Sequence, residues 1–211
     1  WVTGDLAMRY ERASGARRET LFDALQHARV VEAGERYMRL ESGRGPHGWN
    51  ARSLHFATGI ARLLRHYGPA SRAIVWAHNT HVGDSRGTNG RFVGELSLGQ
   101  LARQSLGGTT VFIVGFGTGD GEVLAAKRWG GSCEILTIPP PRPDSLEAEM
   151  LAGGEKDRLW VFSPGEPVPR ILKRWIAHRA IGSTYDPARD AQQNYVPTQV
   201  ASRYDAFIFL P

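Results

Sequence analysis

A run of five apolar residues, 73–77 (AIVWA), is followed at once by the polar segment His78-Asn79-Thr80-His81. A short, continuously apolar run is typical of a parallel strand that is covered on both faces. Ligand sites in open α/β sheets lie just outside the carboxyl ends of such strands. The sequence therefore predicts a buried strand over 71–77 and a candidate site at its C-terminal end.

Apolar runs and helical patterns alternate along the rest of the chain. This alternation predicts an α/β fold, with a mostly parallel sheet flanked by helices and preceded by a helical segment. A closing strand is expected to place Phe207 and Phe209 on one face. The predicted strands cover 71–77, 109–114, 123–127, 133–138, 159–162 and 204–210, and the predicted helices cover 98–106, 145–152 and 168–177.

Residues before position 70 have helical periodicity. Apolar residues recur at three- and four-residue steps over 16–40 and again over 49–67, where Asn50 is the expected N-cap. Residues 1–15 contain two glycines and are expected to be a lead-in of low order. We expect 1–69 to pack as a helical segment on an α/β domain, 70–211, and both to be one part of a longer catalytic domain.

Composition argues against several classes of partner. The net charge is +5, but the chain has no run of five or six basic residues and no nucleic-acid-binding signature, so no nucleic acid is expected. The chain has no apolar stretch of about 18 residues, so no membrane span is expected. The single cysteine, Cys133, cannot form an internal disulfide, which fits a reducing, cytoplasmic location. The first residue is Trp1, so we expect an upstream segment of the same gene product.

His78 and His81 are the strongest candidates for chemistry. One imidazole can act as a general base near neutral pH while the other binds or polarises a carbonyl. A competing hypothesis adds Asp84, because H-x-x-H-x-x-D supplies three donors that zinc accepts in catalytic sites. The spacing leaves both readings open.

Other motifs are weaker. The segment Gly115-Phe116-Gly117-Thr118-Gly119 lacks the further glycine of a dinucleotide-binding loop, since position 120 is Asp120, and it is expected to be a tight turn. Neither Ser163 nor Ser183 lies in a G-x-S-x-G elbow, so a serine nucleophile is not expected. Tyr195 could donate or accept a hydrogen bond across a site.

Several segments together resemble the erythromycin esterase family, from about residue 28 to the end of the chain. The most specific is the string W-A-H-N-T-H-V-G-D, which ends at Asp84. The others follow in the family's order: Trp49-Asn50-x-Arg52-x-x-His55, Leu98-Gly99-Gln100-Leu101, Val114-Gly115-Phe116-Gly117-Thr118, His178-Arg179-Ala180-Ile181-Gly182, Asn194-Tyr195-Val196-Pro197 and Arg203-Tyr204-Asp205-Ala206-Phe207.

The resemblance implies hydrolysis of a macrolide lactone ester by activated water, without a covalent serine and without a clear need for a metal. It implies that His78 and His81 line the active cleft. It also implies that a further histidine, a glutamate and arginines come from an upstream half that is outside these 211 residues. After Arg52, where an acid is expected, the chain has Ser53.

We therefore expect a lactone-ester hydrolase that uses no cofactor and acts on a small-molecule ester. His78 and His81 are the expected catalytic residues. The expected substrate-binding residues are Asn79, Asp84, Arg52 and Gln100. The alternatives are a metal-dependent hydrolase that uses His78, His81 and Asp84, and a non-catalytic binding module that keeps the fold.

Overall fold

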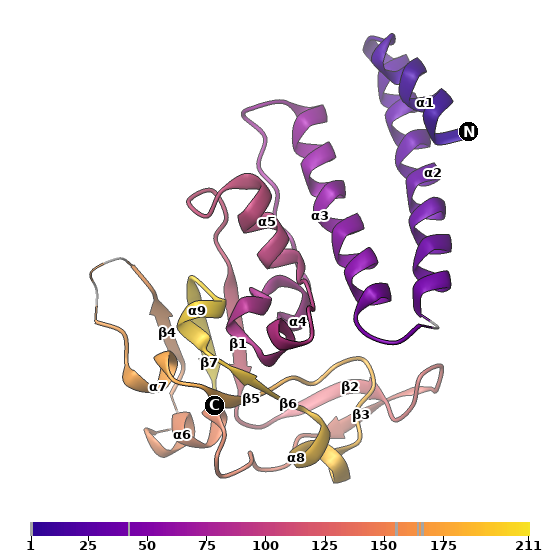
Figure 1. Ribbon diagram of the computed structural model, residues 1–211. Helices are drawn as coiled ribbons and strands as arrows, with labels where there is room; N and C mark the ends of the chain where they lie inside the picture. The colour runs from indigo at the N-terminus through magenta and orange to yellow at the C-terminus, as the bar shows by residue number, and fades with distance from the viewer. Residues whose placement is uncertain (1, 42, 155, 164, 166) are drawn as a thin grey trace. The chain divides into compact units, whose positions relative to one another are not determined.

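The computed structural model describes residues 2–41, 43–154, 156–163, 165 and 167–211. Within these residues the chain divides into two compact units, Trp1–Ile74 and Val75–Pro211 (Figure 1). The first unit is helical, and the second contains all the strands that the described residues form. In the described part of the chain, no helix is both long and apolar enough to cross a membrane.

The first unit consists of α1 (Val2–Glu11), α2 (Gly15–Glu41) and α3 (His47–Tyr67). Tyr10 and Phe22 are buried where the helices meet, and the His66 ring stacks on Phe22 with a centroid distance of 3.7 Å. The low order expected for 1–15 is wrong, since Tyr10 anchors α1 to this core; residue 1 itself lies outside the described residues. Asn50 is not the N-cap either, because α3 begins at His47, directly after Pro46.

The second unit is built on a sheet in the order β1-β7-β4. β1 (Val114–Thr118) runs parallel to β7 (Ala206–Leu210), and β7 runs antiparallel to β4 (Arg158–Val161). The α/β class is confirmed, while the sheet is small and mixed rather than mostly parallel. Antiparallel pairs accompany it: β2 (Glu122–Ala126) with β3 (Cys133–Thr137), and β5 (Ile176–Arg179) with β6 (Tyr195–Thr198).

Short helices and turns connect these strands. Two of the helices, α5 and α6, begin directly after a serine N-cap. The Ser97 side chain accepts from the Gln100 N–H before α5, and the Ser145 side chain accepts from the Ala148 N–H before α6. The connecting elements are α4 (Asn79–Val82), η1 (Ser85–Gly87), η2 (Asn89–Phe92), α5 (Leu98–Leu106), α6 (Leu146–Ala152), α7 (Arg170–Lys173), η3 (Pro187–Arg189), α8 (Asp190–Gln193) and α9 (Val200–Arg203).

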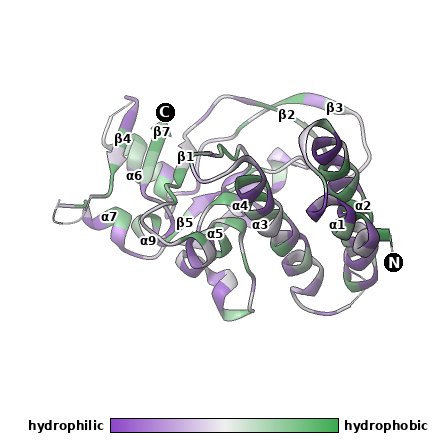
Figure 2. Ribbon diagram, turned by 90° about the horizontal axis from the view of Figure 1, so that it is seen from above, coloured by the Kyte–Doolittle hydropathy of each residue, from purple (hydrophilic) through white to green (hydrophobic). Residues whose placement is uncertain are grey.

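The core of this unit lies against β7. Its sequence, AFIFL, is apolar throughout, and Figure 2 colours the strand green. Phe207 and Phe209 are fully buried, together with Leu146, Leu172 and Val200 from the covering helices. The prediction that both phenylalanines lie on one face of the strand is therefore confirmed, and that face is turned toward the core.

The predicted buried strand over 71–77 is wrong. Residues 72–77 form no strand pairing with any described residue, and the side chains of Ile74 and Trp76 are 95% and 90% exposed. A strand needs a partner for its backbone groups as well as apolar side chains. At the edge of β1, the backbone of Phe116 instead pairs with the side chain of Asn79.

Two other elements begin or end at different residues than predicted. The strand expected over 109–114 begins at Val114, and residues 115–118 of the tight turn expected over 115–119 belong to β1. A Cβ on Gly115 would lie 2.6 Å from Cδ2 of Tyr204, and one on Gly117 would lie 2.8 Å from Cζ of Phe207. Glycine is required here for close packing rather than for a turn. The helix expected over 168–177 is reduced to α7, and the chain then enters β5.

Candidate active site

His78 is the residue immediately before α4, and one of its ring nitrogens is held by Thr80. Nδ1 accepts a hydrogen bond from the Thr80 N–H at 3.2 Å and lies 2.9 Å from the Thr80 hydroxyl, so the histidine caps the helix. The ring proton is therefore on Nε2. The contact with Thr80 thus sets the tautomer of the ring.

Protein atoms around the His78 ring also set its charge. By displacing water they lower the pKa of His78 below 6.5; the hydrogen bond to Ile181 opposes this, and the charges of Arg203 and His178 add to it. The residue nevertheless keeps solvent exposure on one side. At neutral pH His78 is therefore an uncharged imidazole that solvent can reach.

His81 lies on the same short helix. Its backbone N–H donates to the His78 carbonyl at 2.8 Å, and its side chain is half-buried. The structure therefore places the two predicted catalytic histidines at one short helix, His78 as the N-cap of α4 and His81 within its single turn.

Asn79 joins α4 to the edge of β1. Its Oδ1 accepts from the Phe116 N–H at 3.1 Å, and its Nδ2 donates to the Phe116 carbonyl at 2.5 Å. The carbonyl of Ile113 and the N–H of Gly119 form hydrogen bonds with residues 205–206 and with Leu210, on the β7 side. Successive residues of a strand direct their backbone groups to opposite edges, and Phe116 is three residues from each of the two. The backbone groups of Phe116 therefore face the edge away from β7. The Asn79 side chain thus takes the place that a neighbouring strand would have.

Asp84 is buried and held by two arginines. Arg86 donates to both carboxylate oxygens, at 3.0 and 2.7 Å, and Arg103 donates to Oδ2 at 3.1 Å. Burial would raise the pKa of Asp84, but the hydrogen bonds from Arg86 and Arg103 outweigh it and keep the pKa below 3.8. Arg103 also pairs with Asp205 at 2.8 Å, which ties the loop after α4 to the start of β7.

The geometry does not favour the zinc hypothesis. Among the described residues, no three His, Cys, Asp or Glu side chains are arranged to hold a metal ion. The Asp84 carboxylate, the third donor of the predicted H-x-x-H-x-x-D set, already carries its arginine hydrogen bonds.

Gln100 lies beside a serine that the sequence analysis overlooked. Residues 83–87 read G-x-S-x-G, with Ser85 at the centre, but they follow a helix rather than a strand. The buried Ser85 hydroxyl donates to Oε1 of Gln100 and accepts from the Ser97 N–H at 3.0 Å. Ser85 therefore connects the loop to α5 and is not arranged as a nucleophile next to a base.

Arg52, the remaining predicted binding residue, belongs to α3 in the first unit. Its guanidinium lies 5.2 Å from the Trp49 ring and 5.8 Å from the Tyr37 ring, within range of cation–π attraction.

Arg203, at the end of α9, supports α4 from a position 124 residues away in sequence. The side chain is buried; it donates to the Asn79 carbonyl at 3.0 Å and to the Thr198 hydroxyl at 3.1 Å. No local pattern in the sequence marks this contact, which depends on how the chain folds back.

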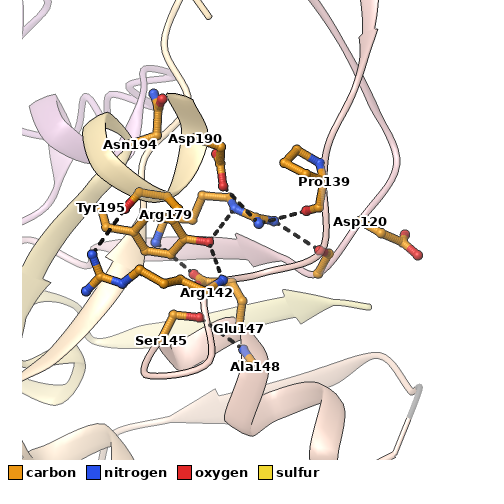
Figure 3. Close-up of polar contacts among 12 residues, drawn as sticks. Asp120, Pro139, Arg142, Ser145, Glu147, Ala148, Arg179, Asp190, Asn194 and Tyr195 are labelled. Atoms are coloured by element: carbon orange, nitrogen blue, oxygen red, sulfur yellow. Dashed lines mark hydrogen bonds and ion pairs between the residues drawn. The ribbon is translucent and has the colours of Figure 1, made fainter. Parts of the chain in front are cut away.

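A second group of buried polar side chains connects α6 with β5. Nδ1 of His178 is 2.7 Å from Oε1 of Glu147, and the same oxygen accepts from the Arg179 N–H at 3.0 Å. Arg179 donates in turn to the carbonyls of Gly119 and Pro139, at 3.0 and 2.9 Å. Figure 3 shows its guanidinium in the middle of this group.

Tyr195 and Asp190 complete this polar group. The Tyr195 hydroxyl accepts from Nε of Arg179 at 2.9 Å and from the Arg142 N–H at 3.1 Å, as the dashed lines in Figure 3 show. Asp190 lies 3.1 Å from Arg179 as a buried ion pair. The sequence predicts a hydrogen bond for Tyr195, whereas no local pattern marks Glu147 or Asp190.

A histidine pair on a one-turn helix beside a small α/β sheet, fixed by distant arginine and backbone contacts, is a site suited to acid–base chemistry. The chain matches the erythromycin esterase family model over residues 4–211 and belongs to that family. Membership points to hydrolase function at this coarse level.

Solved structures agree in fold. A Bacillus cereus protein superposes with a TM-score of 0.76 at 15% identity, and a succinoglycan biosynthesis protein with 0.71 at 16%. A mutant of the erythromycin esterase EreC in its open conformation gives 0.61 at 17%. Each comparison covers 99% of this chain but only 48–50% of the other, so the chain spans about half the length of these proteins.

Proposed function

We propose that this chain carries the histidine pair of an erythromycin-esterase-type hydrolase that opens the lactone ester of macrolide-like substrates. The observation that supports it most is the fixation of His78. Thr80 and the Arg203-bound start of α4 hold an uncharged imidazole in one tautomer at a place that solvent reaches. In this tautomer Thr80 uses the lone pair of Nδ1, so His78 suits the role of a preorganised hydrogen-bond donor through Nε2, and the proton from water would pass to His81.

The reaction needs a proton acceptor and a donor to the developing oxyanion. Water adds to the ester carbon, and its proton passes to one histidine of the pair. The other histidine donates a hydrogen bond to the oxyanion, which then collapses and expels the alcohol. The alcohol oxygen takes up the proton as it leaves, so the product is a hydroxy acid that is heavier than the lactone by one water.

We propose that the other predicted contact residues of this unit position the pair. Both amide atoms of Asn79 are bound to Phe116, Asp84 to its arginines, and Gln100 to Ser85. These hydrogen bonds hold the ends of α4. Direct contacts of these three side chains and of Arg52 with a substrate stay predictions.

Mass spectrometry of macrolides incubated with the full-length gene product tests the proposal. The expected result is a product heavier by one water that is lost in His78→Ala and in His81→Ala. The matched control is His27→Ala, which removes an exposed histidine of α2 and should leave the product yield unchanged. Tight macrolide binding without any product would contradict the proposal and favour a binding module.

A further inference from the structure

One face of the sheet β1-β7-β4 is apolar and exposed. The register sets Phe116 opposite Ile208 and Ile208 opposite Leu159, so these three side chains form a row across the sheet. Val161 and Leu210 point to the same side, because side chains alternate along a strand and each lies two residues from a member of the row. Ile208 is half-buried and the other four are exposed. These five residues are called the outer face below.

The opposite face of the sheet is the core. Phe207 and Phe209 alternate with the outer-face residues of β7 and are fully buried, packed with Leu146, Leu172 and Val200. A sheet that leaves one face in water usually carries polar side chains on that face, whereas apolar residues at every position are typical of a strand covered on both faces. The sequence of β7, AFIFL, is of the second kind. The sheet is therefore suited to a second covering layer.

Trp76 extends the outer face beyond the sheet. Its ring lies 6.2 Å from that of Phe116, and its side chain is also exposed. An apolar surface that continues from three strands onto a neighbouring segment is larger than the single exposed apolar residues common on soluble proteins. Such contiguous patches mark interaction sites.

The solved structures that share this fold indicate what covers the outer face. The chain matches them over 99% of its own length but covers only 48–50% of theirs, so these proteins hold about as much chain again outside the matched part. A segment on the same polypeptide has a high effective concentration at the face. It is therefore favoured there over a second copy or a separate partner.

We propose that the outer face is an intramolecular docking surface. Apolar side chains from the part of the same gene product that lies outside these 211 residues cover it. This proposal is independent of the hydrolase function, because it concerns the packing of the sheet and is tested without substrate.

Cysteine labelling of the full-length gene product tests whether the outer face is covered. Leu159→Cys should react with N-ethylmaleimide more than about 10-fold more slowly than Leu124→Cys, because a covered thiol reacts only after local opening. Leu124 on β2 is the matched control, since the two leucines are 69% and 63% exposed, Leu124 being the former. Peptide mass spectrometry separates the new cysteine from the exposed Cys133. Equal rates would overturn the proposal, and Val161→Cys replaces Leu159→Cys if that variant does not fold.

Photo-crosslinking then identifies the covering segment. The full-length gene product carries p-benzoylphenylalanine in place of Phe116, and the adducts are mapped by mass spectrometry. The expected adducts join position 116 to peptides of the same molecule outside these 211 residues. Adducts confined to the 211 residues, adducts between ¹⁴N- and ¹⁵N-labelled copies, or adducts to another protein would each overturn the proposal.

Discussion

The backbone N–H of Thr80 donates to Nδ1 of His78 at 3.2 Å, so a proposed catalytic residue is also the N-cap of the helix that carries its partner His81. Capping uses the lone pair of Nδ1 and leaves the proton on Nε2. The stability of α4 and the chemistry of the site therefore depend on the same atom, and substitutions at position 78 can separate the two.

Replacing His78 with asparagine or alanine should affect stability and hydrolysis differently. Asparagine is a good N-cap, so His78→Asn should keep the wild-type free energy of unfolding, whereas His78→Ala should lose about 1 kcal/mol. Both should lower kcat by about 10²–10³-fold, because the developing oxyanion loses the hydrogen bond from Nε2 of His78. Urea denaturation and steady-state kinetics measure the two effects. Equal stability of the two variants would show that the cap contributes nothing.

The lowered pKa of His78 predicts a loss of stability in mild acid. Because the folded pKa lies below 6.5, the unfolded chain binds this proton more readily than the folded one. The contribution of His78 is therefore complete above about pH 6.5 and declines as the pH falls toward the folded pKa. An NMR titration of His78 should give a midpoint below 6.5. In His78→Asn, the fall in stability over this pH range should be smaller.

Asp84 should be important for stability and Arg86 should not. Asp84→Asn leaves Arg103, whose side chain is 13% exposed, without a carboxylate in the loop after α4, and should cost about 3 kcal/mol of unfolding free energy. Arg86→Ala removes a side chain that is 55% exposed and should change it by less than about 0.5 kcal/mol. Similar losses in both variants, by thermal or chemical denaturation, would contradict this assignment.

The glycines of β1 should not tolerate a methyl group. Gly117→Ala would place a Cβ 2.8 Å from the Phe207 ring and should lower the free energy of unfolding by about 1–3 kcal/mol. Gly108→Ala is the matched control, since nothing lies within 4 Å of its Cβ, and it should be neutral or slightly stabilising. A neutral Gly117→Ala would mean that β1 and β7 pack less closely than described.

Removal of the Tyr204 hydroxyl should not lower the stability of the protein. It is buried and has no hydrogen-bond partner among the described residues, and burial raises the pKa of Tyr204 to about 12. Tyr204→Phe removes an unsatisfied group, so its free energy of unfolding should equal that of the wild type or exceed it by up to about 1 kcal/mol. A loss above 1 kcal/mol in urea denaturation would show that the hydroxyl has a partner.

Local chemistry accounts for the parts of the fold that the sequence predicts well. The helix expected over 98–106 is α5, and Ser97 caps it as serine caps usually do. The closing strand is apolar enough to be buried in any arrangement of this sheet. The short helix that carries the histidine pair was not predicted: His78 is the N-cap of α4, and His81 lies within its single turn.

The parts that escaped prediction depend on long-range contacts. Arg203 reaches Asn79 across 124 residues, and Glu147 reaches His178 across 31, so neither partner marks the other in sequence. The apolar run 73–77 was misjudged for the same reason. Its composition fits a strand, but pairing is decided by which backbone lies beside it, and here Asn79 takes the edge of β1.

The position of β7 between β1 and β4 determines when the sheet can form during synthesis. The strand in the middle of the sheet is the one that is synthesised last, so β1 and β4 have no central partner until residues 206–210 emerge. Until then, the nascent chain exposes unpaired strand edges and the apolar faces that Phe207 and Phe209 later cover. Sheet closure therefore waits for the last of the three strands, and the part of the chain made before it exposes the kind of apolar surface that chaperones bind.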